Sequence, residues 1–247
     1  MLAPLCKIKL VMSDLVQPKI MSKHNHKKKY QDNFQRLTQK LDRKLYKNKD
    51  FVVVSNNCWG AEIYKRLGLA YNTPFVGLFI FAPDYIKLLE QFDSYINCEL
   101  SFVKESKWSN ATILYPIGLL NDIEIHFMHY KDNEEALSKW LRRVNRMKQI
   151  IDKDKYFFKI CDRDFADSNI LKQFHKLPYK NKISFGISDL DYKNHFKIEE
   201  NEDHKTVPDG IKLYQFSYKY MDVLKWVNSG KVCINIYSKL KCYYKVV

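Results

Sequence analysis

Short runs of hydrophobic residues alternate along the chain with stretches in which hydrophobic residues recur at helical spacing. The continuous apolar runs FVVV, at residues 51–54, and KYFFKI, at residues 155–160, are typical of strands buried on both faces. Residues 74–81 are apolar enough for either a strand or a buried loop. We predict the remaining strands at residues 98–103, 123–127, 181–187 and, at an edge of the sheet, 232–237.

Helical periodicity fills most of the intervals between these runs. Predicted helices cover residues 30–47, 61–69, 82–96, 133–151, 167–177 and 220–230. In the helix at 133–151, acidic residues lie at the start and basic residues toward the end, as the helix dipole favours. Residues 190–210 are rich in charge and contain VPDG, so we expect a loop or insertion there.

This alternation of strands and helices predicts an α/β domain with a mostly parallel sheet. Ligands of such sheets bind beyond the carboxyl ends of the strands. Three polar segments follow or end predicted strands: SNNCWG (55–60), HFMHY (126–130) and CDRD (161–164). We therefore expect these segments to converge on one edge of the sheet and to form the functional site.

Charge divides the 247-residue chain into two parts. Half of the net charge of +14 falls within residues 23–50, which carry a net charge of +7. We predict a basic, flexible arm at residues 1–29 and a single α/β domain at residues 30–247 that begins with the amphipathic helix. A basic surface favours phosphorylated small molecules, and a basic amphipathic helix is compatible with peripheral membrane contact. Nucleic acid is disfavoured, because the arm lacks a recognised binding module.

Cysteine usage and hydropathy indicate the compartment. The six cysteines form no CxxC pair and have no zinc-site spacing, no secretory signal is evident, and no apolar run reaches about 18 residues. We predict a cytoplasmic protein with reduced thiols, and peripheral membrane association stays open as an alternative.

The turn after the first strand carries the strongest candidate chemistry. Cys58 precedes a predicted helix, whose N-terminal amides stabilise a thiolate, so it is a candidate nucleophile. Asn56 and Asn57 are candidate donors to a developing oxyanion, and Trp59 is a candidate substrate contact. The alternative is a buried structural cysteine beside two asparagines that form turns.

The other strand ends offer acid–base and metal chemistry. His126 and His129 are candidate general bases, although residues three apart on one strand face opposite sides. Asp162 is a candidate catalytic residue, and Asp162 with Asp164 forms an Asp-x-Asp pair that suits Mg²⁺ or Mn²⁺ and a nucleotide sugar. Candidate phosphate-binding cations are Arg142 and Arg146, which share a helix face, and Arg163.

Several long stretches resemble one known family. VVSNNCWGAEIYKRLGLAYNTPFVGLFIFAPDYIKLLEQF, YPIGLLNDIEIHFMHY, EEALSKWLRRVNRM and KICDRD resemble, in this order, the bacterial domain-of-unknown-function family nineteen-nineteen, over roughly residues 30–230. The resemblance implies a Rossmann-like fold, for which we expect three layers, and an association with exopolysaccharide or capsule biosynthesis. The Asn57-Cys58 turn is also similar to the Asn-Cys-Gln turn of capsule acetyltransferases that bind coenzyme A, but Trp59 replaces the glutamine.

Three functions follow from this resemblance and from the candidate residues. The leading hypothesis is a transferase that moves an acyl group from acyl-coenzyme A to a polysaccharide precursor. The second is a metal-dependent glycosyltransferase that uses Asp162 and Asp164. The third is a non-catalytic assembly or docking protein of a polysaccharide pathway, in which the basic N-terminal helix makes the contact.

Overall fold

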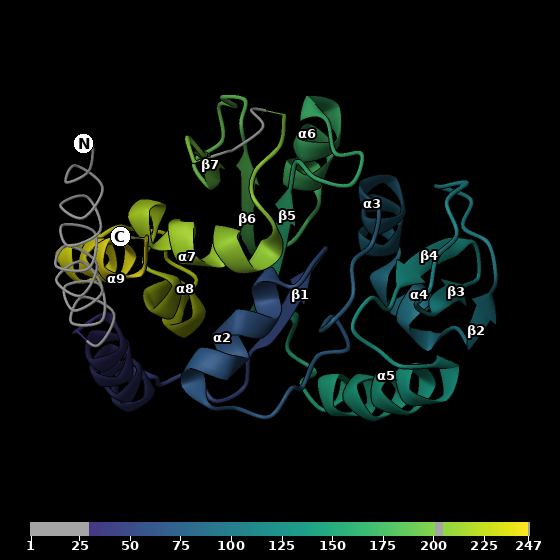
Figure 1. The fold of residues 1–247 in the computed structure, drawn as a ribbon, viewed down its shortest axis with the longest axis horizontal. Helices are drawn as coiled ribbons and strands as arrows, with labels where there is room; N and C mark the ends of the chain where they lie inside the picture. The colour runs from purple at the N-terminus through teal and green to yellow at the C-terminus, as the bar shows by residue number, and fades with distance from the viewer. Residues whose placement is uncertain (1–29, 201–204, 247) are drawn as a thin grey trace, which may run out of the picture.

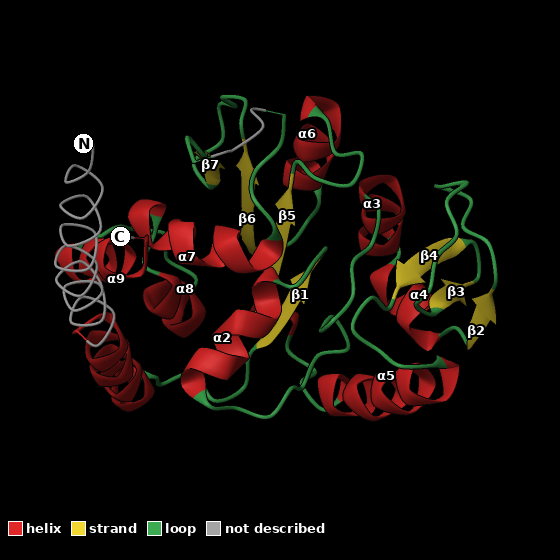
Figure 2. Cartoon of the chain, in the orientation of Figure 1, coloured by secondary structure: helices red, strands yellow, loops and turns green. Residues whose placement is uncertain are grey.

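The structure of the protein is a computed structural model that describes residues 30–200 and 205–246 (Figure 1). Its centre is a four-stranded sheet in the order β1-β5-β6-β7, in which each neighbouring pair is parallel (Figure 2). The strands are β1 (Val52–Ser55), β5 (Tyr156–Cys161), β6 (Asn181–Gly186) and β7 (His195–Lys197). The apolar runs at 51–54 and 155–160 therefore predict the first two strands correctly, and every residue of β1 and β5 is buried.

One face of this sheet is covered by three helices, α2 (Trp59–Leu67), α7 (Gly210–Tyr220) and α8 (Val223–Ser229). Alternate residues of the strands, such as Val53, Phe157 and Phe185, pack there against Trp59 and Trp226. Both α2 and α8 end on a glycine in the left-handed conformation, Gly68 and Gly230, as the sequence predicts.

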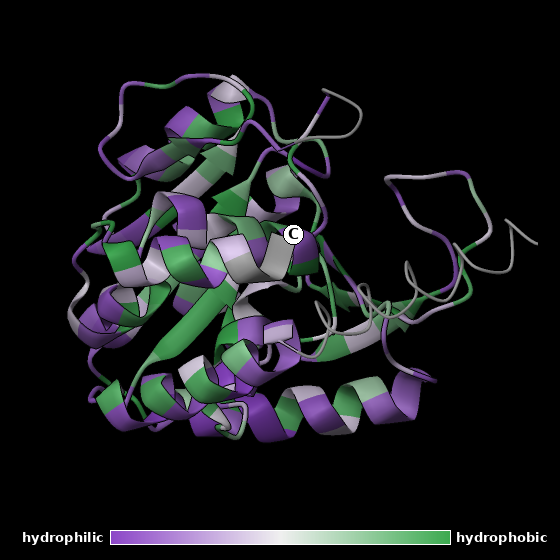
Figure 3. Cartoon of the chain, turned by 60° about the vertical axis from the view of Figure 1, so that its left-hand side comes forward, coloured by the Kyte–Doolittle hydropathy of each residue, from purple (hydrophilic) through white to green (hydrophobic). Residues whose placement is uncertain are grey.

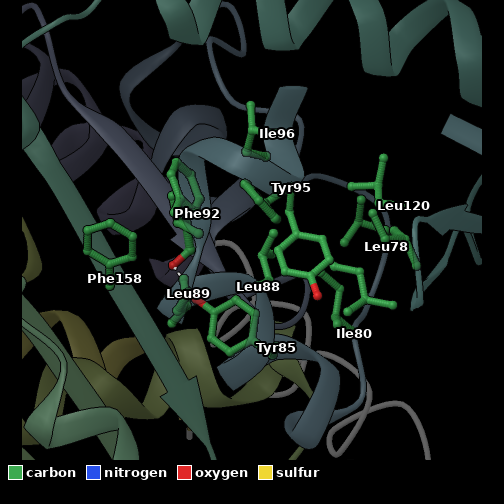
Figure 4. Packing of buried hydrophobic residues seen from close by; sticks show 14 of the residues in the cluster. Leu78, Ile80, Tyr85, Leu88, Leu89, Phe92, Tyr95, Ile96, Leu120 and Phe158 are labelled. Atoms are coloured by element: carbon green, nitrogen blue, oxygen red, sulfur yellow. Dashed lines mark hydrogen bonds between the residues drawn. The ribbon is translucent and has the colours of Figure 1, made fainter. Parts of the chain in front are cut away.

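The opposite face packs against a second hydrophobic cluster (Figure 4). Its helices are α3 (Ala82–Glu90), α4 (Phe92–Asn97), α5 (Asn133–Lys148) and α6 (Ser168–Lys176). Tyr85 and Phe92 lie beside Phe158 of β5 in this cluster. The helices carry alternating hydrophobic and hydrophilic bands, which is typical of helices between a core and solvent (Figure 3).

A separate antiparallel sheet completes this side of the molecule. It consists of β2 (Leu100–Val103), β3 (Ile117–Leu120) and β4 (Ile123–His126), in that order. The prediction of one strand at residues 123–127 is therefore incomplete, because it misses β3, which precedes a hairpin turn at Asn121. Asn121 adopts φ 54°, a left-handed conformation that asparagine tolerates. The protein thus has a mixed α/β fold with a parallel sheet and a small antiparallel one.

The C-terminal region differs most from the prediction. The predicted strand at 232–237 is wrong: residues 231–235 are irregular, and α9 (Ile236–Val246) follows them. Two inward-facing residues of α9 are polar, Ser238 and Lys241, so hydrophobic periodicity gives no helical signal there. Helix α7 was also not predicted, although Leu213, Tyr214 and Tyr218 form its buried stripe.

A helix spans residues 30–45, as predicted, but the leucines of its apolar stripe, Leu37, Leu41 and Leu45, are exposed. It packs on α2 and α9 through a buried ionic cluster, in which Asp42 receives hydrogen bonds from Arg66, Lys241 and Tyr237. Lys241 Nζ lies 3.2 Å from Asp42 Oδ1. The predicted basic arm, residues 1–29, lies outside the described residues. None of the helices in the described part of the chain is both long and apolar enough to cross a bilayer.

Candidate functional site

A cavity of about 320 Å³ opens at the carboxyl ends of β1 and β5. Five chain segments meet there: the turn after β1, the apolar segment before α3, the turns after β4 and β5, and the start of α7. We call it the central cavity. It is lined by Asn57, Cys58, Phe79, Met128, His129, Arg163, Asp164, Asp209, Gly210 and Ile211. Residues of SNNCWG, HFMHY and CDRD therefore line one cavity, although HFMHY follows β4 of the antiparallel sheet and not a strand of the parallel one.

A second cavity of about 290 Å³ adjoins the first, and we call it the adjacent cavity. Cys58, His129 and Ile211 line both cavities. Its other walls come from α2, α5 and the segment around Gly77. Cys58 and His129 therefore lie between two spaces, either of which can hold part of a ligand.

Cys58 is the N-cap residue of α2. Its thiol lies 3.9 Å from the carbonyl oxygen of Leu78, which fits a weak hydrogen bond donated by the thiol. Burial raises the pKa of Cys58 above its usual value, against the smaller attraction of Lys65. The resting side chain is therefore a neutral thiol, and it needs a base to become a nucleophile.

The two candidate histidines occupy different environments. β4 ends at His126, and the following turn brings His129 to the cavity wall, where its backbone amide donates to Gly77 at 3.1 Å. His126 is fully buried and stacks on Phe79, with ring centroids 4.6 Å apart. Burial lowers the pKa of His126, against the opposing attraction of Glu124. Only His129 is placed to exchange protons with a ligand in the cavity.

A buried lysine organises the turn behind Cys58. Lys159 of β5 is fully buried, and its Nζ donates to Asn56 Oδ1 at 3.2 Å and to Asn57 Oδ1 at 3.0 Å. Asn57 Nδ2 donates to Cys161 Sγ at 3.2 Å, and Asn57 Oδ1 also accepts from the amide of Trp59. Burial lowers the pKa of Lys159. Both asparagine side chains thus have interior partners, and their observed role is to fix the turn that presents Cys58.

The CDRD turn separates its two carboxylates. Asp162 accepts backbone amides from Val207 at 2.8 Å and Ile187 at 2.6 Å, so both of its oxygens are engaged. It lines a different, outer cavity of about 760 Å³, whereas Asp164 lines the central cavity. Burial raises the pKa of both carboxyl groups. Across residues 30–200 and 205–246, no three His, Cys, Asp or Glu side chains come together as a metal site requires.

The backbone of the same turn is strained. Asp164 and Phe165 have φ angles of 59° and 66°, although neither is glycine. Left-handed backbone at a bulky residue is uncommon and tends to occur at functional sites. Beside it, Arg163 lines the central cavity and donates to the carbonyl oxygen of Val207 at 2.9 Å. The turn therefore holds one cation and one carboxylate against the cavity.

Three residues that were predicted to contact a substrate line neither the central nor the adjacent cavity. Trp59 is fully buried between Phe185, Tyr214 and Trp226, because α2 turns its first residue into the core. Arg142 is exposed on α5 and lines neither cavity at Cys58. Arg146 donates to the carbonyl oxygen of Tyr71 and lines a separate pocket of about 530 Å³ with Lys49 and Lys155.

Some residues of the site escaped the sequence analysis. Lys159 interrupts the apolar run YFFKI, and a lysine inside a strand buried on both faces is a signal for a buried polar cluster. The predicted loop at 190–210 includes Asp209 and Gly210 and ends next to Ile211. Asp209 caps α7 by accepting the amides of Ile211 and Lys212. A β-carbon at Gly210 would come within 2.8 Å of the Trp59 amide nitrogen, so α7 begins against the start of α2.

Comparison with known proteins agrees with the resemblance noted from the sequence. The model of the family described as domain of unknown function DUF1919 matches residues 26–228, which is most of the chain. The protein belongs to the DUF1919 family. The matched DUF1919 region contains Cys58, His129, Lys159, Asp162 and Asp164.

A curated relative comes from Haemophilus influenzae and carries the name "uncharacterized protein". It is 36% identical to this chain over 196 residues, which cover 76% of this chain and 88% of the relative. The similarity therefore extends over most of the length of that relative.

The arrangement is suited to covalent transfer chemistry. A thiol and an imidazole line the same space, and Asp164 and Arg163 also line it. A base beside a cysteine can generate the thiolate, which is the reactive form. The two adjoining cavities offer separate room for a donor and an acceptor.

Proposed function

We propose that this DUF1919 protein is a transferase that moves an acyl group from a thioester donor, such as acyl-coenzyme A, to a hydroxyl group of a cell-surface polysaccharide precursor. The observation that carries the proposal is that Cys58 and His129 line the same two adjoining cavities at the carboxyl end of the parallel sheet. The resemblance to proteins of exopolysaccharide biosynthesis is the basis for the choice of acceptor. The proposal includes a Rossmann-like, three-layer fold and a cytoplasmic location, where acyl-coenzyme A is made.

The reaction proceeds in two half-reactions. His129 takes the proton from Cys58, and the thiolate attacks the carbonyl carbon of the donor thioester. The carbon–sulfur bond to coenzyme A breaks, and its thiolate leaves with the proton from His129. The acyl group is then a thioester of Cys58. His129 next takes a proton from the acceptor hydroxyl, whose oxygen attacks this thioester, and Cys58 leaves as a thiol with that proton.

The surrounding residues have positioning roles in this scheme. Lys159, Asn56 and Asn57 hold the turn that carries Cys58. Asp164 and Arg163 line the central cavity, where they orient the polar acceptor by hydrogen bonds. His126, which is buried behind Phe79, supports the wall rather than the chemistry.

The experiment is to trap the acyl-enzyme. The purified full-length protein is incubated with acetyl-coenzyme A, and intact-protein mass spectrometry and peptide mapping locate the acetyl group. We expect acetylation of Cys58 in the wild type, none in Cys58→Ala, and slow acetylation in His129→Gln. Cys98→Ala is the matched control, because Cys98 is another partly buried thiol, which bonds the carbonyl oxygen of Ser94. Acetylation that is lost in Cys98→Ala and retained in Cys58→Ala would overturn the assignment of the nucleophile.

The same preparation tests the two other functions. Thermal stabilisation by a nucleotide sugar that depends on Mn²⁺ and disappears in Asp164→Asn would favour a metal-dependent glycosyltransferase. The separation of Asp162 from Asp164 and the engagement of both Asp162 oxygens count against it. A protein that binds neither donor but associates with anionic vesicles would favour a docking role for the basic N-terminal helix.

A further inference from the structure

The adjacent cavity contains a buried cation that has no counter-ion. Arg143 of α5 lines this cavity and is 7% exposed. Its Nη1 donates to two neutral oxygens, the hydroxyl of Tyr130 and the carbonyl of Val76. Within the described part of the chain, Arg143 forms no ion pair, and its Nε and Nη2 have no hydrogen-bond partner. Neither nitrogen is among the fully buried side-chain atoms that lack a partner, so this edge of the guanidinium is open to the solvent of the cavity, where an anion can replace water.

The packing around Arg143 fixes the position of this charge. The guanidinium lies over the ring of Tyr71, 5.1 Å from its centroid, and beside the ring of Tyr130. Tyr130 in turn donates its hydroxyl to the carbonyl of Val76. The aromatic contacts and the bonds from Nη1 leave one edge of the guanidinium, Nε and Nη2, for another partner. Two parallel N–H donors in this geometry match two oxygens of a phosphate or carboxylate.

The rest of the cavity favours a group with more than one negative charge. Lys65 and Lys139 also line it, and Glu62 is the only carboxylate that lines it among the described residues. Lys65 is bonded to Glu62 at 2.6 Å, and Lys139 to Glu135 at 2.5 Å. Both lysines are partly exposed, so they can turn toward an incoming anion at small cost. The three cations, Arg143, Lys65 and Lys139, thus have two carboxylate partners between them, which leaves one positive charge unneutralised.

We propose that the adjacent cavity is a subsite for a phosphate or diphosphate group of the donor, held by Arg143 with Lys65 and Lys139. The identification of the ligand as the donor rests on the proposed transfer at Cys58. The anion site itself does not, because it is defined by Arg143, Lys65 and Lys139. Cys58 and His129 form the boundary between this subsite and the central cavity. A donor that is anchored by its phosphates would therefore place its reactive end at Cys58.

The position of Arg143 differs from the phosphate clamp predicted from the sequence. Arg142 and Arg146 lie on the outer side of α5, whereas Arg143 belongs to the inward stripe with Trp140, Val144 and Met147. An arginine inside an otherwise apolar stripe is a stronger sign of a buried ligand contact than two arginines on the solvent side.

The test is the binding of inorganic pyrophosphate to the full-length protein, measured by isothermal titration and by thermal shift at constant ionic strength. We expect pyrophosphate to bind the wild type and the matched control Arg142→Met equally, because residue 142 is exposed one position away on the same helix. In Arg143→Gln, the dissociation constant should rise at least tenfold. Lys139→Glu should weaken binding by a similar factor. Because residue 139 is partly exposed, this variant tests the proposal even if Arg143→Gln does not fold.

Three results would overturn the proposal. The first is equal binding of pyrophosphate to wild type, Arg143→Gln and Lys139→Glu. The second is no binding to the wild type. The third is acetate competing as well as pyrophosphate, which would assign the cavity to a carboxylate instead. Cys58→Ala should keep wild-type affinity for pyrophosphate, so loss of acyl transfer with retained binding separates a failure of the proposed reaction from a failure of the subsite.

Discussion

Replacing Asp42 by alanine should strongly lower the free energy of unfolding, because this carboxylate neutralises two buried cations. Asp42 is 1% exposed, and Arg66 and Lys241, at 8% and 1% exposed, both bond to it. Breaking a buried ion pair by removing one partner costs about 3–5 kcal/mol, since a charge is left buried without compensation. Tyr237 would also lose an acceptor at 3.1 Å. We expect the upper part of this range.

The assay is urea unfolding followed by circular dichroism, with thermal unfolding beside it. For a domain of this size, each kcal/mol corresponds to about 2–4 °C, so a loss of about 4–5 kcal/mol should lower the melting temperature by roughly 8–20 °C. Asp50→Ala is the control: Asp50 pairs with Lys155 at 3.2 Å, but the two side chains are 66% and 39% exposed. Such a surface pair contributes about 0–1 kcal/mol.

The charge state of Lys241 gives a second readout. Burial lowers the pKa of Lys241, so this lysine can lose its proton more easily than an exposed one. In Asp42→Ala, the destabilisation should therefore shrink as the pH is raised toward about 10, where an uncharged amine costs little to bury. A loss below about 1 kcal/mol at pH 7, similar to that of Asp50→Ala, would refute the view that the cluster holds helix 30–45 on the domain.

Three further changes test other parts of the fold. Asn121→Ala should cost about 1 kcal/mol and Asn121→Gly almost nothing in urea unfolding, since residue 121 is left-handed at φ 54°; equal costs would contradict this account of the hairpin. Gly230→Ala should cost more than about 2 kcal/mol by the same measurement, because φ is 68° and the new β-carbon would lie 2.2 Å from Asn181 Oδ1; a neutral effect would show that Asn181 moves freely. Burial lowers the pKa of His175 to about 4, so the folded state binds fewer protons than the unfolded state below pH 6.5, and stability should fall from about pH 6.5 to 4. His175→Gln should flatten this fall in the urea midpoint, and an unchanged pH profile would assign the effect to other groups.

Hydrophobic pattern predicted the elements whose buried faces are apolar. β1, β5, β6, α5 and α6 have such faces, and their positions agree with the sequence analysis within a few residues. The caps were also predictable: Asp167 accepts the amide of Ile170, and Gly68 ends α2. Where the buried face is polar or mixed, as in α9, the pattern gives no helical period. The strand propensity of VCINIY is overridden there by packing on helix 30–45.

The sequence predicted where the cavity lies, but it predicted few of the side-chain contacts within it. Polar turns after β1, β4 and β5 indicated where a cavity would form, because they follow apolar strands. The sequence could not distinguish His126 from His129, since that choice depends on where β4 ends. Nor could the sequence show that both Asp162 oxygens accept hydrogen bonds from the amides of Ile187 and Val207. These residues lie far from Asp162 along the chain, and a local sequence pattern does not predict such long-range contacts.

Gly210 has a consequence for the evolution and engineering of this protein. The nearest atoms to a β-carbon at this position belong to Trp59 and Asn57, at 2.8 and 2.9 Å, so α7 docks directly on the turn that carries Cys58. Position 210, the first residue of α7, therefore cannot gain a side chain unless the turn at Cys58 moves. Loop exchange between DUF1919 proteins offers a way to alter what enters the central cavity, provided that each graft ends with Asp209 and Gly210.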